Sequence, residues 1–184
     1  MDVSQGLSSV FLSCVSWFIS TAVFMSALPE ILELAMKSLP HGPEFRFVDR
    51  MVSLTPGKEG VGEYRVRGDE FYLRGHLPGE PILPGVLLVE AGAQVAGMVA
   101  QEDPANPTWP RMKLTALRAV KILGSARPGD TLRIEAVITG HLGALIQAEV
   151  SASIANIRVL SAELTLAGMP KASGPAKKNT RAAR

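Results

Sequence analysis

Cysteine and aromatic residues are scarce in this chain of 184 residues. Cys14 is the only cysteine, which excludes a disulfide framework within the chain and a cluster of zinc-binding thiolates, and which favours a reducing compartment such as the cytoplasm. Aromatic residues make up 5% of the sequence, and they do not alternate with basic residues as in proteins that bind single-stranded nucleic acid. Internal repeats and metal-ligand spacings are absent too. These absences indicate a single domain that uses no cofactor and no metal and binds no nucleic acid.

The positive charge is concentrated at the C-terminal end. Residues 170–184 contain five basic residues and no acidic residue. Because the whole chain has a net charge of +2, subtracting these five leaves −3 for the remainder. A segment of small and charged residues cannot bury enough apolar surface to fold. We therefore predict a disordered basic tail at 170–184, and the basic character of the protein is a property of that tail.

The opposite end is apolar. Residues 3–29 contain no charged side chain, and such a span is long enough to cross a membrane. A secretory signal needs a basic beginning and a small-residue cleavage site, whereas Asp2 is the only early charge. We favour a start codon assigned too early, because Met25 and Met36 precede the motifs of the folded domain. A membrane anchor and an additional docking helix are the alternatives for this leader of residues 1–28, so membrane contact by residues 3–29 stays open.

The most informative segment is 75–97, GHLPGEPILPGVLLVEAGAQVAG. Its three prolines stiffen the approach to a helix, and Pro84 suits the first helical position because proline needs no N–H partner there. From residue 86 to 101, the only polar side chains before the end are Glu90 and Gln94, one turn apart on one face. We expect a buried helix, with strands approaching closely at Gly92 and Gly97.

Glu90 is the unusual residue of this helix. An ionised carboxylate in apolar surroundings is costly to desolvate, so Glu90 must have a partner, carry a proton, or line a cavity open to substrate or water. His76 lies before the helix and can transfer protons near neutral pH. Spacing alone would also allow a solvated glutamate and an ordinary loop histidine. The pair is nevertheless a candidate for acid/base catalysis.

The same segment closely resembles the signature of the β-hydroxyacyl-acyl carrier protein dehydratases of FabZ type, roughly G-H-F-P-G-x-P-x-x-P-G-V-L-x-x-E-A-x-A-Q. Leu77 replaces the usual phenylalanine. The resemblance extends over roughly residues 29 to 168, where Gly42-Pro43-Glu44 and Val120 are further departures. The related FabA-type dehydratase-isomerases carry aspartate where this chain has Glu90. The glutamate therefore favours dehydration without isomerisation.

The resemblance implies the hot-dog fold, an α+β architecture in which an antiparallel sheet wraps around a central helix. It also implies dehydration of (3R)-3-hydroxyacyl-acyl carrier protein to trans-2-enoyl-acyl carrier protein in the biosynthesis of fatty acids or a related lipid. We expect His76 to be the general base and Glu90 to act at the hydroxyl group. Gly85, at the positive end of the helix, would donate its N–H to the thioester oxygen. Gln94 would either orient Glu90 or only pack in the core.

The resemblance further implies that His76 and Glu90 come from different subunits of a homodimer, and that dimers assemble into hexamers. The acyl chain would arrive on the phosphopantetheine arm of acyl carrier protein, an acidic partner that basic side chains attract. Candidate contacts are Arg111, Lys113, Arg118, Lys121 and Arg127. We interpret His41 and His141 as structural. The rival hypotheses are a hot-dog acyl thioesterase and a non-catalytic acyl-binding subunit.

The remaining pattern predicts a domain at residues 29–169 made mostly of strands. Apolar and polar residues alternate in six segments separated by turn residues, at 45–54, 60–66, 112–123, 131–140, 145–154 and 159–167. Residues 29–38 are predicted to form a short amphipathic helix on the domain surface. Residues 102–110, rich in proline, are predicted to form a loop in which Trp109 either caps the substrate tunnel or merely packs.

Overall fold

The computed structural model describes residues 29–106, 109 and 111–169. The predicted leader at 1–28, which contains Cys14, and the predicted tail at 170–184 lie outside the described residues. Within the described residues, no helix is long and apolar enough to cross a membrane.

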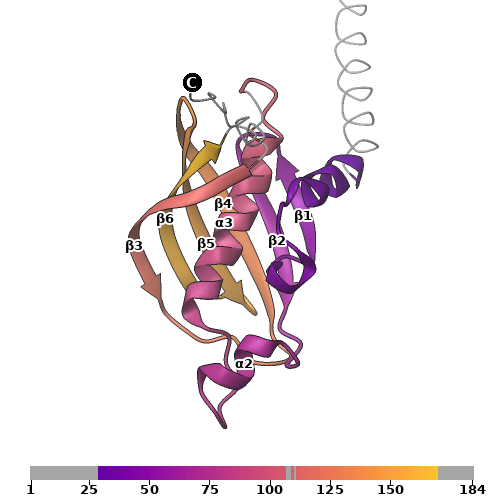
Figure 1. Cartoon of the computed structure of the whole chain (residues 1–184), viewed down its shortest axis with the longest axis vertical. Coiled ribbons are helices and arrows are strands. Elements are labelled where there is room, and N and C mark those ends of the chain that lie inside the picture. Colours follow the sequence, from indigo (N-terminus) through magenta and orange to yellow (C-terminus); the bar gives the residue numbers. More distant parts are fainter. Residues whose placement is uncertain (1–28, 107–108, 110, 170–184) are drawn as a thin grey trace, which may run out of the picture.

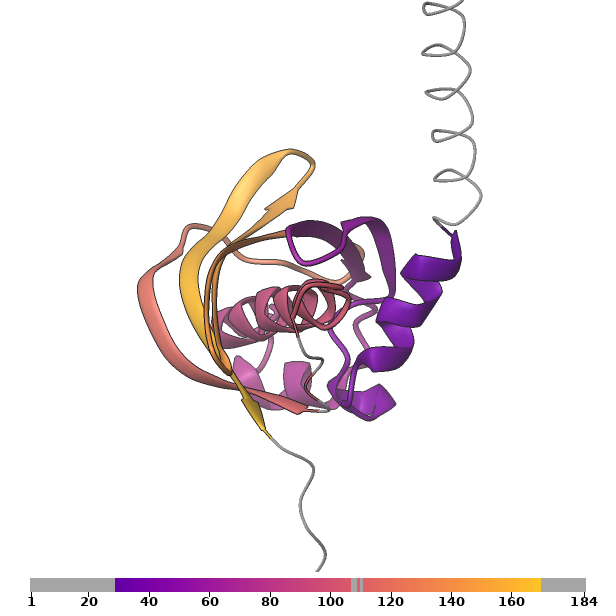
Figure 2. The ribbon, with the colours of Figure 1, turned by 90° about the horizontal axis from the view of Figure 1, so that it is seen from above.

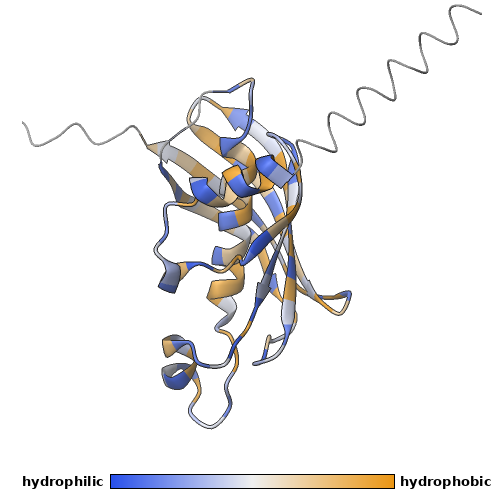
Figure 3. Cartoon of the chain, turned by 90° about the vertical axis from the view of Figure 1, so that its right-hand side faces the viewer, coloured by the Kyte–Doolittle hydropathy of each residue, from blue (hydrophilic) through white to orange (hydrophobic). Residues whose placement is uncertain are grey.

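The described chain forms one antiparallel sheet with helices on one side of it (Figure 1). In spatial order, β1 and β2 are followed by β4, β5 and β6, and β3 forms the far edge. Hydrophilic and hydrophobic residues alternate along the strands (Figure 3), as expected when one sheet face is buried. The strands are β1 (Arg50–Thr55), β2 (Glu59–Arg65), β3 (Arg111–Ile122), β4 (Thr131–Leu142), β5 (Leu145–Ile154) and β6 (Ile157–Met169).

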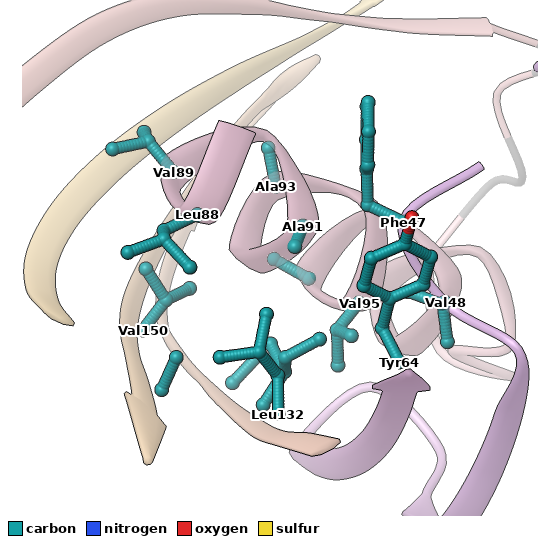
Figure 4. Packing of buried hydrophobic residues seen from close by; sticks show 14 of the residues in the cluster. Phe47, Val48, Tyr64, Leu88, Val89, Ala91, Ala93, Val95, Leu132 and Val150 are labelled. Carbon is teal, nitrogen blue, oxygen red and sulfur yellow. The ribbon is translucent and has the colours of Figure 1, made fainter. Parts of the chain in front are cut away.

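The sheet curves around the long helix α3 (Gly85–Gln101), which lies inside the curve in Figure 2. Leu132 of β4 and Val150 of β5 point toward α3, and Val150 lies beside Leu88 (Figure 4). A Cβ atom on Gly92 would lie 2.8 Å from the Val150 side chain, so the predicted close approach of a strand is confirmed there. This wrapped helix is the hot-dog fold that the sequence predicts.

Gly97 behaves differently from Gly92. A Cβ atom at Gly97 would meet only Leu166, at 4.0 Å, which is an ordinary van der Waals contact. The prediction of a close strand approach was therefore wrong at this position. The space beside Gly97 belongs to a cavity that is described below.

The predicted helix at residues 29–38 is confirmed. Its buried Ala35 and the partly buried Ile31, Leu32 and Met36 pack against the core. In Figure 2 this helix lies on the side of α3 opposite β3 and β6. It therefore covers the part of α3 that the sheet leaves open.

Three local predictions require correction. Helix α3 begins at Gly85, because Pro84 has an extended ψ of 131° and occupies the N-cap position. Residues 45–49 form no strand, since Phe45 ends a short 3-10 helix η1 (Pro43–Phe45) and the backbone of residues 45 and 47 bonds to a side chain of α3. A helix α2 (Phe71–His76) was not predicted, because six residues are too few for a recognisable helical pattern.

Candidate active site

A cavity of about 370 Å³ lies beside the polar residues of α3. Its walls are residues 39–45, the side of α3 that runs from Glu90 to Gln101, and the beginning of β3. Apolar atoms come from residues such as Leu39, Met112 and Leu166. Its size is typical of a pocket for a small ligand.

Glu90 lies at this cavity and is held by neighbouring donors. Its side chain is 22% exposed, although the residues that flank it along α3 are buried. Gln94 donates from Nε2 to Glu90 Oε1 at 3.0 Å. His41 Nε2 lies 3.4 Å from the same oxygen. Of the three alternatives for Glu90, the structure thus shows two, a polar partner and an open cavity.

Gln94 connects α3 to the segment that precedes the sheet. Its side chain is 2% exposed, and it is the buried polar residue of the described core. Nε2 also donates to Phe45 O at 2.9 Å, while Oε1 accepts from Phe47 N at 2.9 Å. These bonds replace strand pairing for residues 45 to 47, which explains the strand that the sequence pattern wrongly predicts. Gln94 therefore bonds to Glu90 and, at the same time, joins α3 to the segment of residues 45–47.

His76 ends α2 and is exposed. Its Nδ1 lies 3.2 Å from Ile82 O. A carbonyl oxygen only accepts hydrogen bonds, so Nδ1 carries the proton in this pair and Nε2 is left with a free lone pair. His76 does not line the cavity beside Glu90. Within one chain, the structure therefore brings together Glu90 and Gln94 but does not place His76 in their cavity.

The loop before α2 is fixed by Glu70. Its carboxylate accepts bonds from the backbone N–H groups of Arg67 and Gly68, at 2.8 and 2.7 Å, and from the buried Tyr64 hydroxyl at 2.9 Å. Burial by itself raises the pKa of Glu70, but these hydrogen bonds outweigh it, and the pKa lies below its ordinary value. The Tyr64 hydroxyl also contacts that of Tyr72 in α2, at 2.8 Å. This network determines where α2, and hence His76, lies.

Gly85 is the first residue of α3, and no side chain caps the helix at Pro84. The first N–H groups of a helix lack partners within it and lie at its positive end. A Cβ atom on Gly85 would lie 2.7 Å from Ile122 at the end of β3. A side chain at this position would therefore displace the half-exposed Ile122 side chain, so glycine leaves room at the beginning of α3.

The other residues singled out in the sequence, His141 and Trp109, do not line the cavity. His141 Nε2 is 3.6 Å from Asp103 Oδ2. Trp109 packs against Gly168 and does not line the cavity, which favours packing over a capping role. Within the part of the chain that the structure describes, no group of three or more acidic, histidine or cysteine side chains could hold a metal.

Sequence reasoning missed the position of His41. The structure places it at the cavity and next to Glu90, although its sequence context suggested only a structural role. The single signal in the sequence was that His41 lies within residues 29–168, the region that resembles the family, and this carries no information on what the imidazole contacts.

Comparison with solved structures defines the class of fold. A chain of the dehydratase heterocomplex ApeI:P from Xenorhabdus doucetiae superposes with a TM-score of 0.64 at 18% identity. The match covers 74% of this chain and 91% of that chain. At this identity the likeness shows the fold alone, and it places the chain among hot-dog proteins.

Sequence comparison defines the family. The family profile described as a FabA-like domain matches residues 39–163. The 3-hydroxyacyl-[acyl-carrier-protein] dehydratase FabZ of Chloroflexus aggregans is 35% identical over 143 residues, which are 78% of this chain and 96% of that protein. The FabZ of Geotalea uraniireducens is 46% identical over 103 residues, or 54% of this chain and 70% of that protein. The chain belongs to the FabZ-type dehydratase family, as its motifs predict.

Proposed function

We propose that this protein is a lyase that dehydrates (3R)-3-hydroxyacyl-acyl carrier protein to trans-2-enoyl-acyl carrier protein, in the biosynthesis of fatty acids or a related lipid. The observation that carries the proposal is the carboxyl group of Glu90. It extends from a buried apolar helix, has a fixed partner in Gln94, and opens onto a cavity. Relatives named for this activity align with most of the chain.

In the proposed reaction, His76 removes a proton from C2 of the acyl thioester. The electron pair of that C–H bond forms the double bond between C2 and C3 as the C3–O bond breaks. The hydroxyl group takes a proton from Glu90 and leaves as water. The bond between His76 Nδ1 and Ile82 O supports this assignment, because it leaves Nε2 free to accept the proton.

Negative charge develops on the thioester oxygen when the C2 proton is removed. The N–H of Gly85, at the uncapped beginning of α3, is our candidate donor to that oxygen. Gln94 would keep the Glu90 carboxyl in place during the reaction, since both the NH2 and the C=O of its side-chain amide are bonded to the backbone and the amide cannot easily reorient. In this assignment His76 and Glu90 transfer protons, whereas Gly85 and Gln94 stabilise charge and geometry.

His76 and Glu90 of one active site would belong to different subunits of a homodimer, which would assemble further into a trimer of dimers. The edge strand β3 supports the dimer. All its residues except Met112 are exposed, and they include large apolar side chains such as Leu117 and Ile122. An apolar edge strand is a template for pairing with a second copy. Residues of β3 also line the Glu90 cavity, so a partner docked there would reach it.

The proposed partner is acyl carrier protein, which would deliver the acyl substrate to the enzyme. The proposed location of both proteins is the cytoplasm. The basic residues predicted to attract it are exposed. Lys113 is also at the cavity, and Arg127 forms an ion pair with Glu80 at 2.8 Å. Exposed positive side chains mainly accelerate association with an acidic partner.

The test is to mix the purified protein with 3-hydroxyacyl-acyl carrier protein of several chain lengths and to follow the acyl carrier protein by intact mass spectrometry. We expect loss of one water, and its regain from the enoyl form. Glu90→Gln should slow the interconversion by about 10²–10⁴-fold, the usual contribution of a general acid. Glu33→Gln is the matched control, because Glu33 is an exposed carboxylate on the surface helix, and it should behave as wild type.

Two other outcomes would refute the proposal in different ways. Release of free fatty acid would identify a hot-dog thioesterase. No mass change at any chain length, with the acyl carrier protein still bound, would identify a non-catalytic acyl-binding subunit.

A further inference from the structure

We infer that His41 is a positioning residue for Glu90, holding one oxygen of the carboxyl group so that the other faces the substrate. The inference rests on the proposed dehydratase function, because it concerns the residue that protonates the leaving hydroxyl group. His41 itself touches neither the substrate nor the reacting atoms in this scheme.

Two side-chain nitrogens converge on the same oxygen of Glu90, one through a hydrogen bond from Gln94 and the other through an ion-pair contact with His41. Gln94 Nε2 lies 3.0 Å and His41 Nε2 lies 3.4 Å from Oε1. They come from different parts of the molecule, because Gln94 is one turn further along α3 and His41 is in the segment that crosses over it. Oε1 is therefore occupied from two sides, and Oε2 is the oxygen that remains for the substrate.

This arrangement determines where a protonated Glu90 carries its proton. A hydrogen on Oε1 would point toward a group that is itself a donor, which is unfavourable. The proton therefore belongs on Oε2, from which it can be transferred to the substrate hydroxyl. If His41 is removed, Oε1 loses one donor and the two oxygens become more nearly equivalent.

The tautomer of His41 follows from its surroundings. Its Nδ1 is buried and has no hydrogen-bond partner among the described residues. A buried N–H without an acceptor is costly, and an unprotonated Nε2 would present a lone pair to a carboxylate oxygen. The proton of the neutral ring therefore lies on Nε2, facing Glu90.

The segment that carries His41 is anchored independently of Glu90. Its carbonyl oxygen accepts from Arg46 Nε at 2.8 Å, and its ring packs against Phe45 with a centroid distance of 5.8 Å. Among the described residues that line the cavity, Lys113 of β3 is the only other titratable side chain. His41 is thus held by its own segment, and its contact with Glu90 is a consequence of that anchoring.

The test compares two variants of similar size. In His41→Gln the side-chain amide can place a donor near the former Nε2, whereas His41→Leu fills the space without a donor. If His41 positions Glu90, His41→Leu lowers kcat about ten- to a hundred-fold, as small misplacements of catalytic groups do, and leaves KM nearly unchanged. His41→Gln restores most of the lost kcat. Equal rates for the two variants, or a Leu variant as active as wild type, would overturn the inference.

His141→Leu is the matched control, because His141 makes a similar contact, 3.6 Å, to a carboxylate away from the cavity. Its kcat should equal that of wild type. If the wild-type protein is inactive, the proposed function is refuted, but the role of His41 is not yet tested. The contact between His41 and Glu90 is therefore also measured through protein stability, which does not depend on activity. A double-mutant cycle of His41→Leu and Glu90→Gln in urea unfolding supplies this measurement. Coupling between the two sites is expected, and additive effects would show that the imidazole does not hold the carboxyl group.

Discussion

The two sides of α3 depend on different interactions, close packing on one side and hydrogen bonds on the other. On the sheet side, Leu88 is fully buried and Gly92 lies directly against Val150, so that side is specified by shape. On the side that faces residues 39–47, Glu90 and Gln94 are specified by hydrogen bonds, and Gly97 has free space beside it. A single apolar helix can therefore supply both the core of a domain and a polar site, provided that a second segment covers it.

Because of this difference, substitutions on the two sides of α3 should affect different properties. Substitutions that alter packing on the sheet side should lower the free energy of unfolding and leave the kcat of the folded protein nearly unchanged. Substitutions that remove a polar group at the site should lower kcat while the protein stays folded.

The largest effect is expected for His76→Ala. Removing the proposed general base should lower dehydration by about 10²–10⁴-fold. Because the side chain is exposed, the free energy of unfolding should change by less than about 0.5 kcal/mol. Enzyme assays and urea denaturation of the same preparation measure both quantities. Full activity in this variant would contradict the catalytic assignment.

The reverse pattern is expected for Leu88→Ala on the sheet side. Truncating a fully buried leucine removes its packing and leaves a cavity, which costs about 2–5 kcal/mol of unfolding free energy. The kcat of the fraction that stays folded should be close to that of wild type. If Leu88→Ala has the wild-type free energy of unfolding but no activity, the sheet side of α3 also contributes to catalysis and the proposed separation is wrong.

Gln94→Leu should lower both the free energy of unfolding and the activity, because Gln94 bonds to the backbone of residues 45 and 47 and also to Glu90. Phe47 N–H and Phe45 C=O would lose their partners, and we expect a loss of about 2–4 kcal/mol from these unsatisfied groups. Activity should fall as well, since Glu90 loses its closest donor. Gln94→Glu keeps the acceptor for Phe47 N–H but turns a carboxyl oxygen toward two acceptors, Phe45 O and Glu90 Oε1, so it should be at least as destabilised as Gln94→Leu. A Gln94→Glu variant that is clearly more stable than Gln94→Leu in urea denaturation would contradict this reading of the amide.

The smallest effects come from a matched pair, Gly92→Ala and Gly97→Ala. Both substitutions bring the same gain in helix propensity, so their difference isolates packing. The new methyl group would overlap Val150 at Gly92 but not Leu166 at Gly97. We expect Gly92→Ala to be less stable than Gly97→Ala by about 1–3 kcal/mol. Thermal or urea unfolding gives the difference, and equal stabilities would show that the sheet can move away from α3.

Local patterns in the sequence were sufficient for the main features of the fold. The helix around Glu90 is long and apolar, and the six strands alternate between polar and apolar residues, so both kinds of element were predictable. The strand predicted over residues 45–49 was wrong because Gln94, far along the chain, provides its hydrogen bonds. Single-sequence patterns contain no information on such distant partners.

The site was predictable to a similar extent. The pair of Glu90 and Gln94 follows from helical spacing, and their hydrogen bond is confirmed. His41 was not recognised, because the contact that singles it out is made with a residue distant in sequence. The proximity of His76 to Glu90 stays a prediction, since it requires a second copy of the chain.

The most direct test of the account is whether the active site is assembled from two copies. The His76→Ala and Glu90→Gln variants, each of which is expected to be inactive alone, are unfolded together in urea and refolded as a mixture. Random pairing makes about half of the dimers mixed, each with one intact site of two, so we predict about a quarter of wild-type dehydration activity. A mixture as inactive as the separate variants would contradict a site shared between subunits.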